Sequence, residues 1–359
     1  CPDAHQGYGA PIGGVLATKG VVIPNFVGVD IGCGMCAVKT SLKELDTGTL
    51  KHIMGEIRKV VPVGFNKHNK NQDERLMPKG IRFGYDKDLF PICDYDLSIC
   101  GYNYRNALKS LGTLGGGNHF IEIQKGNDGH IWIMIHSGSR NLGKQVADHY
   151  NKLAIELNEK WHSSIPKEHQ LAFLPLDSDE GRAYISEMNY CIKFALANRR
   201  LMMDNVIAVL SKQFPDKEIV EEPMINIAHN YARMENHFGE NVMIHRKGAT
   251  LATKETIGII PGSQGTKSYI VKGRGNPESF NSCSHGAGRK MGRKEAERTL
   301  NLEEEVRKLD DMGVLHAIRG IKDLDEAPGS YKNIDEVMEN QKDLVEILVE
   351  LTPLAVVKG

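Results

Sequence analysis

Three histidines, a cysteine and an aspartate stand where apolar stretches of this sequence begin or end. His136 and His229 each close an apolar run, and His119 opens another. Asp30 and Cys33 follow a fourth run, three residues apart and among glycines. Imidazole, thiolate and carboxylate groups together suit a borderline divalent metal better than Mg²⁺ alone. If the thiolate bridged two ions, the group would form a two-metal centre of the kind that handles phosphates.

Cys33 and Cys36 also form a C-x-x-C pair, a spacing that occurs in thiol–disulfide redox motifs. No second pair follows nearby, and Gly32 and Gly34 flank Cys33 where a redox motif would normally open a helix. The pattern therefore favours metal binding over redox chemistry. Considered by itself, the same turn could also be a structural one that buries a cysteine.

Three turns rich in glycine and polar side chains are candidates for binding phosphate through backbone N–H groups: Gly115–Asn118, Pro261–Ser268 and His285–Arg289. None is a Walker motif, because G-x-x-x-x-G-K-[ST] does not occur. His285 stands between small residues, with room for a bulky group on its ring. It could be a sixth metal ligand or a nucleophile that forms a phosphorus–nitrogen bond, and the pattern does not separate the two roles.

Short apolar runs and longer helical periodicities alternate along the chain and predict one α+β domain. The ends of such strands cluster at one rim of a sheet, where sites are commonly built. Strands are expected at 21–23, 27–29, 120–123, 131–135, 224–228, 242–244, 257–260 and 269–271. Helices are expected at 45–61, 103–111, 142–161, 183–214 and 335–352. Arg199 and Arg200, on the longest of these helices, are expected on a solvated face.

Composition places few other limits on function. The chain has 359 residues and a formal net charge of −1, so no global field points to nucleic acid, although a local basic site remains open. No apolar run approaches the roughly 20 residues of a membrane span. Seven scattered cysteines, an odd number, argue against a disulfide scaffold and for a reducing compartment. We therefore expect a cytoplasmic protein.

Together these motifs resemble the RtcB family of RNA ligases, and the resemblance spans residues 1–359 as a single domain. It implies the family's own α+β architecture, with mixed β-sheets, flanking helices and a metal and nucleotide cleft at strand ends. The family segment that normally precedes Pro2 and Asp3 is expected to be missing. The motifs that carry the resemblance are Gly28–Gly34, Gly115–Glu122, His136–Arg140, Ala228–Asn230, Pro261–Ser263 with Ser268, and Ser284–Arg289.

The family joins an RNA 3′-phosphate or 2′,3′-cyclic phosphate to a 5′-hydroxyl, with GTP and Mn²⁺, in tRNA splicing or RNA repair. By resemblance, two manganese ions are bound by Asp30, Cys33, His119, His136 and His229, with Cys33 bridging. His285 is similar to the residue that takes GMP. The implied GTP contacts are Asn118, His119, Phe120, Ile121, Glu122, His229, Asn230, Pro261, Gly262, Ser263, Gln264, Ser268, His285, Gly286, Ala287, Gly288, Tyr331 and Lys358.

Within that set the resemblance implies separate roles around the base. Phe120 would stack near guanine, Glu122 would accept from its N–H edge, and Lys358 would reach its carbonyl oxygen. Arg140 and Arg289 are candidate contacts to RNA phosphates. An archease-type activator is a further expected partner, and no membrane is involved.

One departure from the family bears on specificity, because Gln264 stands where the family often has Met and adjoins the nucleotide. The competing hypotheses are a metal-dependent phosphatase or cyclic phosphodiesterase that acts on RNA ends without ligation, and a non-catalytic RNA-repair scaffold. The first would not need His285 or a nucleobase pocket, and the second would predict eroded ligands. The sequence retains His285, the candidate nucleobase residues Glu122 and Lys358, and all five candidate metal ligands, so it favours neither alternative.

Overall fold

The computed structural model describes residues 1–85, 91–93 and 97–359 of the chain. At its centre lies a seven-stranded sheet in which every pair of neighbouring strands is antiparallel. In spatial order its strands are β13 (Ile257–Ile260), β14 (Ser268–Gly273), β16 (Val345–Lys358), β6 (Phe120–Gly126), β7 (Ile131–Ser137), β3 (Gly34–Lys39) and β9 (Ile225–Ala228).

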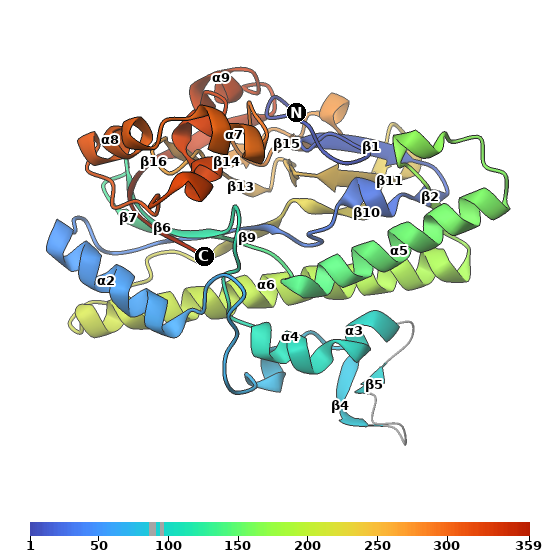
Figure 1. Ribbon diagram of the computed structural model, residues 1–359, viewed down its shortest axis with the longest axis horizontal. Coiled ribbons are helices and arrows are strands. Elements are labelled where there is room, and N and C mark those ends of the chain that lie inside the picture. The colour runs from blue at the N-terminus through green and yellow to red at the C-terminus, as the bar shows by residue number, and fades with distance from the viewer. Residues whose placement is uncertain (86–90, 94–96) are drawn as a thin grey trace.

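Smaller sheets accompany the central sheet, and all but the β4–β5 pair (Ile81–Tyr85 with Pro91–Cys93) lie on its side of the long helices, whereas that pair lies on the other side, beside α3 (Ser98–Tyr102) (Figure 1). A three-stranded sheet contains β1 (Gly14–Thr18), β11 (Glu240–Lys247) and β10 (Asn230–His237). Two-stranded pairs are formed by β12 (Ala249–Leu251) with β15 (Ser282–Ser284), β2 (Val21–Val22) with β8 (Leu174–Pro175), and β4 (Ile81–Tyr85) with β5 (Pro91–Cys93).

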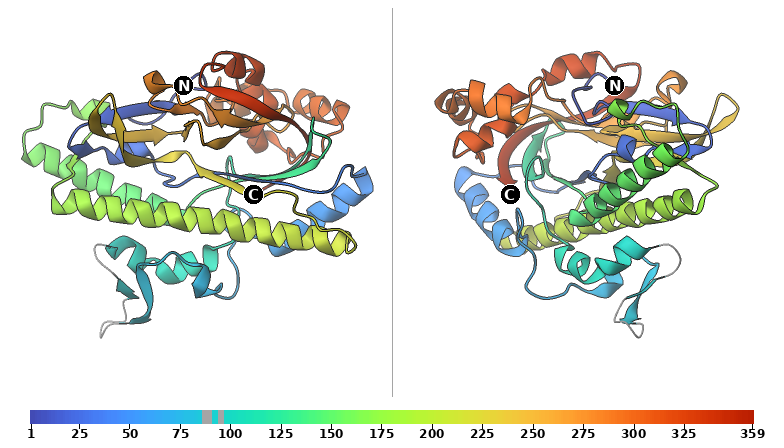
Figure 2. Two further views of the ribbon diagram at one scale, coloured as in Figure 1. Left: turned by 180° about the vertical axis from the view of Figure 1, so that it is seen from behind. Right: turned by 45° about the vertical axis from the view of Figure 1, so that its right-hand side comes forward.

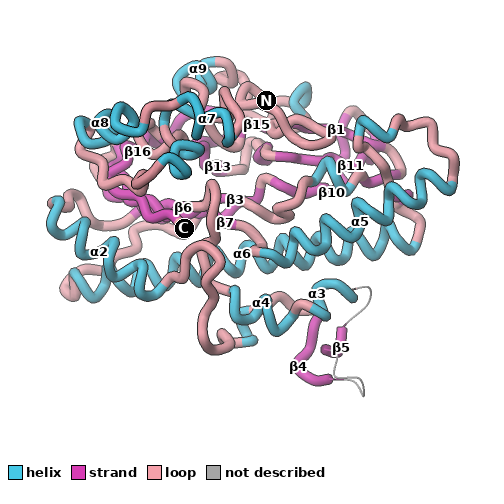
Figure 3. The backbone as a smooth tube through the Cα atoms, viewed as in Figure 1, coloured by secondary structure: helices cyan, strands magenta, loops and turns pink. Residues whose placement is uncertain are grey.

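Two long helices, α5 (Asn141–Lys160) and α6 (Asp179–Gln213), run along one side of the sheets, and α2 (Thr47–Val60) lies beside them (Figures 1 and 2). Figure 3 shows the division into a strand layer and a helix layer. The shorter helices are α1 (Pro24–Val27), α3 (Ser98–Tyr102), α4 (Tyr104–Ser110), α7 (Arg293–Thr299), α8 (Leu302–Asp311) and α9 (Ile334–Glu339). Single 3₁₀ turns are η1 (Glu74–Leu76), η2 (Lys167–His169), η3 (Pro277–Ser279), η4 (Ile321–Glu326) and η5 (Pro328–Ser330).

Strand β7 explains why the sheet is central, because all seven of its residues are buried. Its alternate side chains enter two different apolar clusters. Ile133 and Ile135 pack with α2 and α6 on one face, whereas Trp132 and Met134 pack with β13 and β14 on the other. A strand with both faces covered needs a continuous apolar run, which is the pattern that predicted it. The α+β class is therefore confirmed.

The long helix α6 begins where its sequence supplies a cap. The Ser178 side chain accepts a hydrogen bond from the backbone N–H of Gly181 at 3.0 Å, and Asp179 and Glu180 complement the helix dipole in the first turn. Its 35 residues span about 50 Å, so a single helix crosses beneath several strands. Within the described residues, no helix has both the length and the apolar character that membrane crossing requires.

The prediction that Arg199 lies on a solvated face of α6 is wrong, because its side chain is fully buried. Its guanidinium donates to the carbonyl oxygens of Gly32 at 3.0 Å and Ser137 at 2.8 Å, and to the Asn226 side chain at 2.8 Å. Arg200 is exposed and pairs with Asp204, as predicted for a surface position. Helical periodicity does not show that a cation on the packed face donates hydrogen bonds to backbone carbonyl oxygens of the neighbouring loops.

Two other element predictions are wrong. Residues 335–352 form the short helix α9 followed by β16, because pairing with β6 and β14 overrides the helical spacing of Val345–Leu351. Residues 27–29 do not form a strand. Pro24 starts a single helical turn, which ends at Gly28 with a φ of 92°.

Replacing Arg199 by Met should destabilise the protein, because the carbonyls of Gly32 and Ser137 would lose their donor in a buried setting. We expect the free energy of unfolding to fall by about 3 kcal/mol. Arg200→Met is the matched control, since Arg200 is exposed, and it should change stability by less than about 0.5 kcal/mol. Urea unfolding midpoints measure both, and equal effects of the two substitutions would contradict the role given to Arg199.

Candidate metal and nucleotide site

The chemistry-bearing residues come together because neighbouring strands are antiparallel. In such a sheet the start of one strand lies beside the end of the next. Cys33 precedes β3, whose first residue, Gly34, pairs with the last residues of both β7 and β9. His136 in β7 pairs with Phe120, the first residue of β6. His119 and His229 flank these strand ends, so one edge of the sheet carries Cys33 and the three histidines, four of the five ligand candidates.

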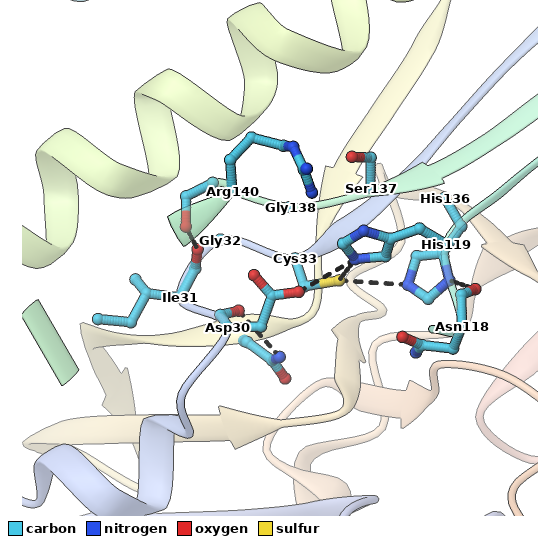
Figure 4. A network of polar contacts seen from close by, with 12 residues as sticks. Asp30, Ile31, Gly32, Cys33, Asn118, His119, His136, Ser137, Gly138 and Arg140 are labelled. Atoms are coloured by element: carbon cyan, nitrogen blue, oxygen red, sulfur yellow. Dashed lines mark hydrogen bonds and ion pairs between the residues drawn. The ribbon is translucent and has the colours of Figure 1, made fainter. Parts of the chain in front are cut away.

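Cys33 lies at the centre of two groups of potential metal ligands. One group is Cys33, His136 and His229, and the other is Asp30, Cys33 and His119; within each, the ligand atoms lie within 4.8 Å of one another. The Cys33 sulfur lies 3.2 Å from Nε2 of His136 and 3.5 Å from Nε2 of His119, which in turn lies 3.1 Å from Asp30 (Figure 4). Two groups that share one sulfur match the arrangement expected of a bridging thiolate.

The histidine rings are held in the orientation that metal binding needs. Nδ1 of His119 lies 3.0 Å from the carbonyl oxygen of Leu114, and Nδ1 of His136 lies 3.0 Å from that of Asn118. A carbonyl can only accept, so each Nδ1 carries the proton and each Nε2 lone pair faces the sulfur. Nδ1 of His229 is buried and has no hydrogen-bond partner among the described residues. These donors fit a metal ion.

Burial controls the charge of these ligand candidates. It raises the pKa of the Cys33 thiol well above its usual value, and the nearby Asp30 carboxylate raises it further. Burial also lowers the pKa values of His136 and His229 well below the usual range, so both imidazoles are neutral. A bound dication would reverse the preference at the sulfur, because it stabilises the thiolate.

The turn that carries Asp30 and Cys33 fits tightly against its neighbours. A Cβ at Gly138 would lie 2.3 Å from an oxygen of the Asp30 side chain, so only glycine leaves room for that carboxylate. The backbone N–H of His229 donates to the carbonyl oxygen of Cys33 at 2.8 Å. Arg199 holds the same turn from the helix side through Gly32. The site is therefore fixed before any ligand arrives.

His285 lies beside this cluster, and its ring centroid is 4.8 Å from that of His229. Its Nδ1 lies 2.6 Å from a carboxylate oxygen of Asp3, which also accepts from the His285 backbone N–H at 3.1 Å. Asp3 is fully buried; burial raises its pKa, but the charge and hydrogen bonds of His285 outweigh this and keep the pKa below its usual value. A carboxylate at Nδ1 leaves Nε2 as the nitrogen available for reaction.

Two of the three turns expected to bind phosphate, Pro261–Ser268 and His285–Arg289, lie against each other. The backbone N–H of Ala287 donates to the carbonyl oxygen of Pro261 at 3.0 Å, and a Cβ at Gly286 would lie 3.3 Å from the same oxygen. A Cβ at Gly288 would lie 2.2 Å from the carbonyl oxygen of Asp3, so this turn also packs on the N-terminal segment. Asn230 donates to the carbonyl oxygen of Asp30 at 3.1 Å and joins the same region to the metal cluster.

Glu122 lies on the same face of β6 as Phe120 and is buried. Burial raises its pKa to about 8, although the charge of Lys358 and a hydrogen bond from Gln124 act in the other direction. Gln124 also donates to the Ser268 hydroxyl at 3.1 Å, and that oxygen accepts from the backbone N–H of Gly262 at 3.1 Å. These bonds link the carboxyl group to the Pro261–Ser268 turn.

The remaining predicted residues are already engaged. Lys358 and Tyr331 both donate to Glu326, at 3.1 and 2.5 Å, and Arg289 donates to the same carboxylate at 3.2 Å. Gln264 uses both ends of its amide, because it donates to the Glu326 carbonyl oxygen and accepts from the Ala317 N–H, each at 3.1 Å.

Arg140 is engaged as well, since it donates to Thr113, to the Leu114 carbonyl oxygen and to the Gly64 carbonyl oxygen. In this conformation the guanidiniums of Arg140 and Arg289 tie protein segments together. Their expected contacts to RNA phosphates stay predictions.

Sequence reasoning missed three residues that organise the site, namely Asp3, Arg199 and Glu326. Asp3 lies 282 positions from His285, and no local pattern connects them. Glu326 follows Asp325 in an acidic segment that reads as a solvated face, yet only 6% of its surface is exposed. No local pattern marks Asp3 or Arg199 as part of the site either, and Arg199 lies on a helix with many polar residues.

The sheet edge and its two ligand groups are those of a candidate metal-binding protein. The sequence matches the family tRNA-splicing ligase RtcB over residues 1–359. The RNA-splicing ligase RtcB of Escherichia coli (strain K12) is 37% identical over 383 residues, which cover 100% of this chain and 89% of that protein. The tRNA-splicing ligase RtcB of Thermococcus kodakarensis is 31% identical, with 100% of this chain and 86% of that protein covered. The chain belongs to the RtcB family and is an RNA ligase.

Cys33→Ala should abolish high-affinity binding of Mn²⁺, because Cys33 belongs to both ligand groups. Cys36→Ala is the matched control. Its sulfur is equally buried but points to the carbonyl oxygen of Arg199 at 3.8 Å, so its loss should leave metal binding unchanged and cost about 1 kcal/mol of stability. Equilibrium dialysis with Mn²⁺ measures the bound metal. Equal losses from the two substitutions would contradict the metal assignment and favour a C-x-x-C function.

Proposed function

We propose that this chain uses GTP and manganese to join RNA 3′-phosphate or 2′,3′-cyclic phosphate ends to 5′-hydroxyl ends, through a guanylylated His285. The observation that carries the proposal is the contact between Asp3 and Nδ1 of His285, directly beside the metal-ligand cluster. A histidine oriented by a buried carboxylate, with its second nitrogen turned toward a phosphate-handling site, is the arrangement a nitrogen nucleophile needs.

Asp30, Cys33, His119, His136 and His229 would hold the metal ions, with Cys33 shared between them. When bound, these ions offset the negative charge of the triphosphate and of the RNA phosphates. The protein's part is to keep three imidazoles close to one sulfur in a buried setting. The carbonyl oxygens of Leu114 and Asn118 perform this by fixing two of the rings.

In the first step, Nε2 of His285 attacks the α-phosphorus of GTP. A P–N bond forms, the bond from phosphorus to the bridging oxygen breaks, and pyrophosphate leaves with that electron pair. The Nδ1 proton stays on the hydrogen bond to Asp3, whose negative charge offsets the positive charge that develops on the ring. Asp3 therefore acts as a positioning residue for the nucleophile.

The later steps follow the family's chemistry. Water opens a cyclic end to give a 3′-phosphate, and an oxygen of this phosphate displaces His285 from the GMP phosphorus. The 5′-hydroxyl then attacks the activated 3′-phosphate, a phosphodiester bond forms and GMP leaves. Backbone N–H groups of the turns at 261–264 and 285–288 would contact these phosphates. An archease-type activator is a further partner that the family resemblance suggests.

His285→Ala should eliminate protein labelling by α-³²P-labelled GTP while leaving Mn²⁺ and GTP binding in place. In the unsubstituted protein the label should be lost in acid and retained in alkali, because a P–N bond is acid-labile. His5→Ala is a suitable control, since the ring of His5 stacks 6.4 Å from that of His285 but lacks the bond to the Asp3 carboxylate. If His285→Ala lost manganese and kept slow labelling, His285 would be a ligand and not the nucleophile.

Glu122→Ala should weaken the use of GTP by more than about tenfold, because the N1–H and N2–H₂ groups of guanine would lose their acceptor in a buried pocket. Glu346→Ala, which removes an exposed carboxylate from β16 of the same sheet, should have no effect. The rate of labelling at limiting GTP measures both variants. Equal labelling of the unsubstituted protein by ATP and GTP would overturn the pocket assignment.

A further inference from the structure

We propose that Glu326 is a positioning residue for guanine recognition, which holds the Lys358 ammonium apart from Glu122 so that a 6-oxopurine can bind between them. The proposal rests on the proposed function, because it concerns the same nucleotide site. It assigns a role to a residue that is outside the metal cluster and that no sequence motif marks.

Glu326 is the point at which four side chains meet. Its Oε2 accepts from Nζ of Lys358 at 3.1 Å and from the hydroxyl of Tyr331 at 2.5 Å. Its Oε1 lies 3.2 Å from Nη1 of Arg289 and 3.1 Å from Nη1 of Arg293. The carboxylate is therefore surrounded by three cations and a phenol, with both oxygens in use.

The strand register shows what Lys358 would do without this partner. In the pairing of β16 with β6, Val356 lies opposite Glu122 and Lys358 lies opposite Phe120. Lys358 is therefore diagonal to Glu122 on one face of the sheet, a separation of roughly 7–8 Å that a lysine side chain can span. Released from Glu326, the ammonium would pair with Glu122 and close the space between them.

The two carboxyl groups differ in the charge they carry. Burial would raise the pKa of Glu326, but Lys358 and the two arginines outweigh it and keep the pKa below its usual value. Burial dominates at Glu122 and raises its pKa to about 8. The ionised partner of Lys358 is thus Glu326. Glu122 is not held in an ion pair within the part of the chain that the structure describes, so its carboxyl group is left to accept from the N–H edge of a base, while Lys358 presents N–H donors to a carbonyl oxygen.

Gln264 explains why Glu326 stays in place. Its Nε2 donates to the backbone carbonyl oxygen of Glu326, and its Oε1 accepts from the N–H of Ala317. The side chain is buried, and it fastens the end of η4 to the Pro261–Ser268 turn. Methionine has neither a donor nor a strong acceptor and could not make this pair of bonds. Gln264 therefore acts on the base pocket through Glu326.

The test uses Glu326→Gln in the full chain, with initial rates of guanylylation-type labelling measured for three triphosphates. GTP is compared with inosine triphosphate, which lacks the 2-amino group, and with 2-aminopurine riboside triphosphate, which lacks the 6-oxo group and the N1 proton. We expect the KM for GTP to rise about tenfold while kcat stays within about twofold. The preference for GTP over 2-aminopurine riboside triphosphate should fall, and the part that depends on the N1 proton and Glu122 should remain. The preference over inosine triphosphate, which depends on Glu122, should persist.

Asp325→Asn is the matched control. Asp325 accepts from Arg293 at 2.6 Å and makes no ion pair with Lys358 among the described residues, so base preference should not change. Lys358→Ala should reproduce the loss of discrimination at the 6-position, and adding Glu326→Gln to it should cause no further loss. An additive double variant would overturn the proposal.

If Glu326→Gln does not fold, Glu326→Asp replaces it, because the shorter side chain keeps the charge and withdraws it from Lys358. The same selective loss, smaller in size, is expected, and an unchanged base preference would overturn the proposal. A fall in kcat without a change in KM would overturn it as well. If the unsubstituted protein takes no label from GTP, the proposed function fails. If it takes label and both variants discriminate as it does, only the role of Glu326 fails.

Discussion

The close approach of three strands at Gly34 is the constraint on which the metal cluster depends. Gly34 pairs with Ser137 on one side and Ala228 on the other, and a Cβ there would lie 2.0 Å from the carbonyl oxygen of Ile227. Because no side chain separates the strands, Cys33 lies between the ends of β7 and β9. His136 and His229 then face the same sulfur without any long side chain having to reach for it.

A buried cluster of ligands has to avoid isolated charges. The pKa values of His136 and His229 are lowered and that of the Cys33 thiol is raised, so these three groups are neutral, while the Asp30 carboxylate lies 3.1 Å from His119. The fully buried charges nearby are paired instead: the Arg199 guanidinium faces two carbonyl oxygens and an amide, and Asp3 faces His285. The protein thereby holds its ligands in place by hydrogen bonds to backbone, and leaves the charge of the centre to the ions it binds.

The sequence predicted the elements with strong periodicity and the ligands that follow them. Apolar runs at 131–135 and 224–228 became β7 and β9, and the histidines at their ends meet at one edge. The prediction failed at 335–352, where local spacing was helical but pairing with two strands decided the outcome. It also failed at Arg199, because the face of a helix that packs against polar loops does not look apolar. Long-range ion pairs such as Asp3 with His285 leave no trace in local pattern.

Glu122 and Glu326 show why a nucleobase pocket is harder to predict than a metal site. A metal site needs particular residue types near strand ends, and these can be seen in sequence. The proposed base pocket needs two glutamates whose pKa values are shifted in opposite directions. Both glutamates are almost fully buried, yet the pKa of one is raised by desolvation and that of the other is lowered by three cations. Only the positions of Lys358 and the arginines separate the group that accepts from a base from the group that holds a lysine. Since those positions come from β16, the segment before α7 and the first residue of α7, the distinction exists only after the chain has folded.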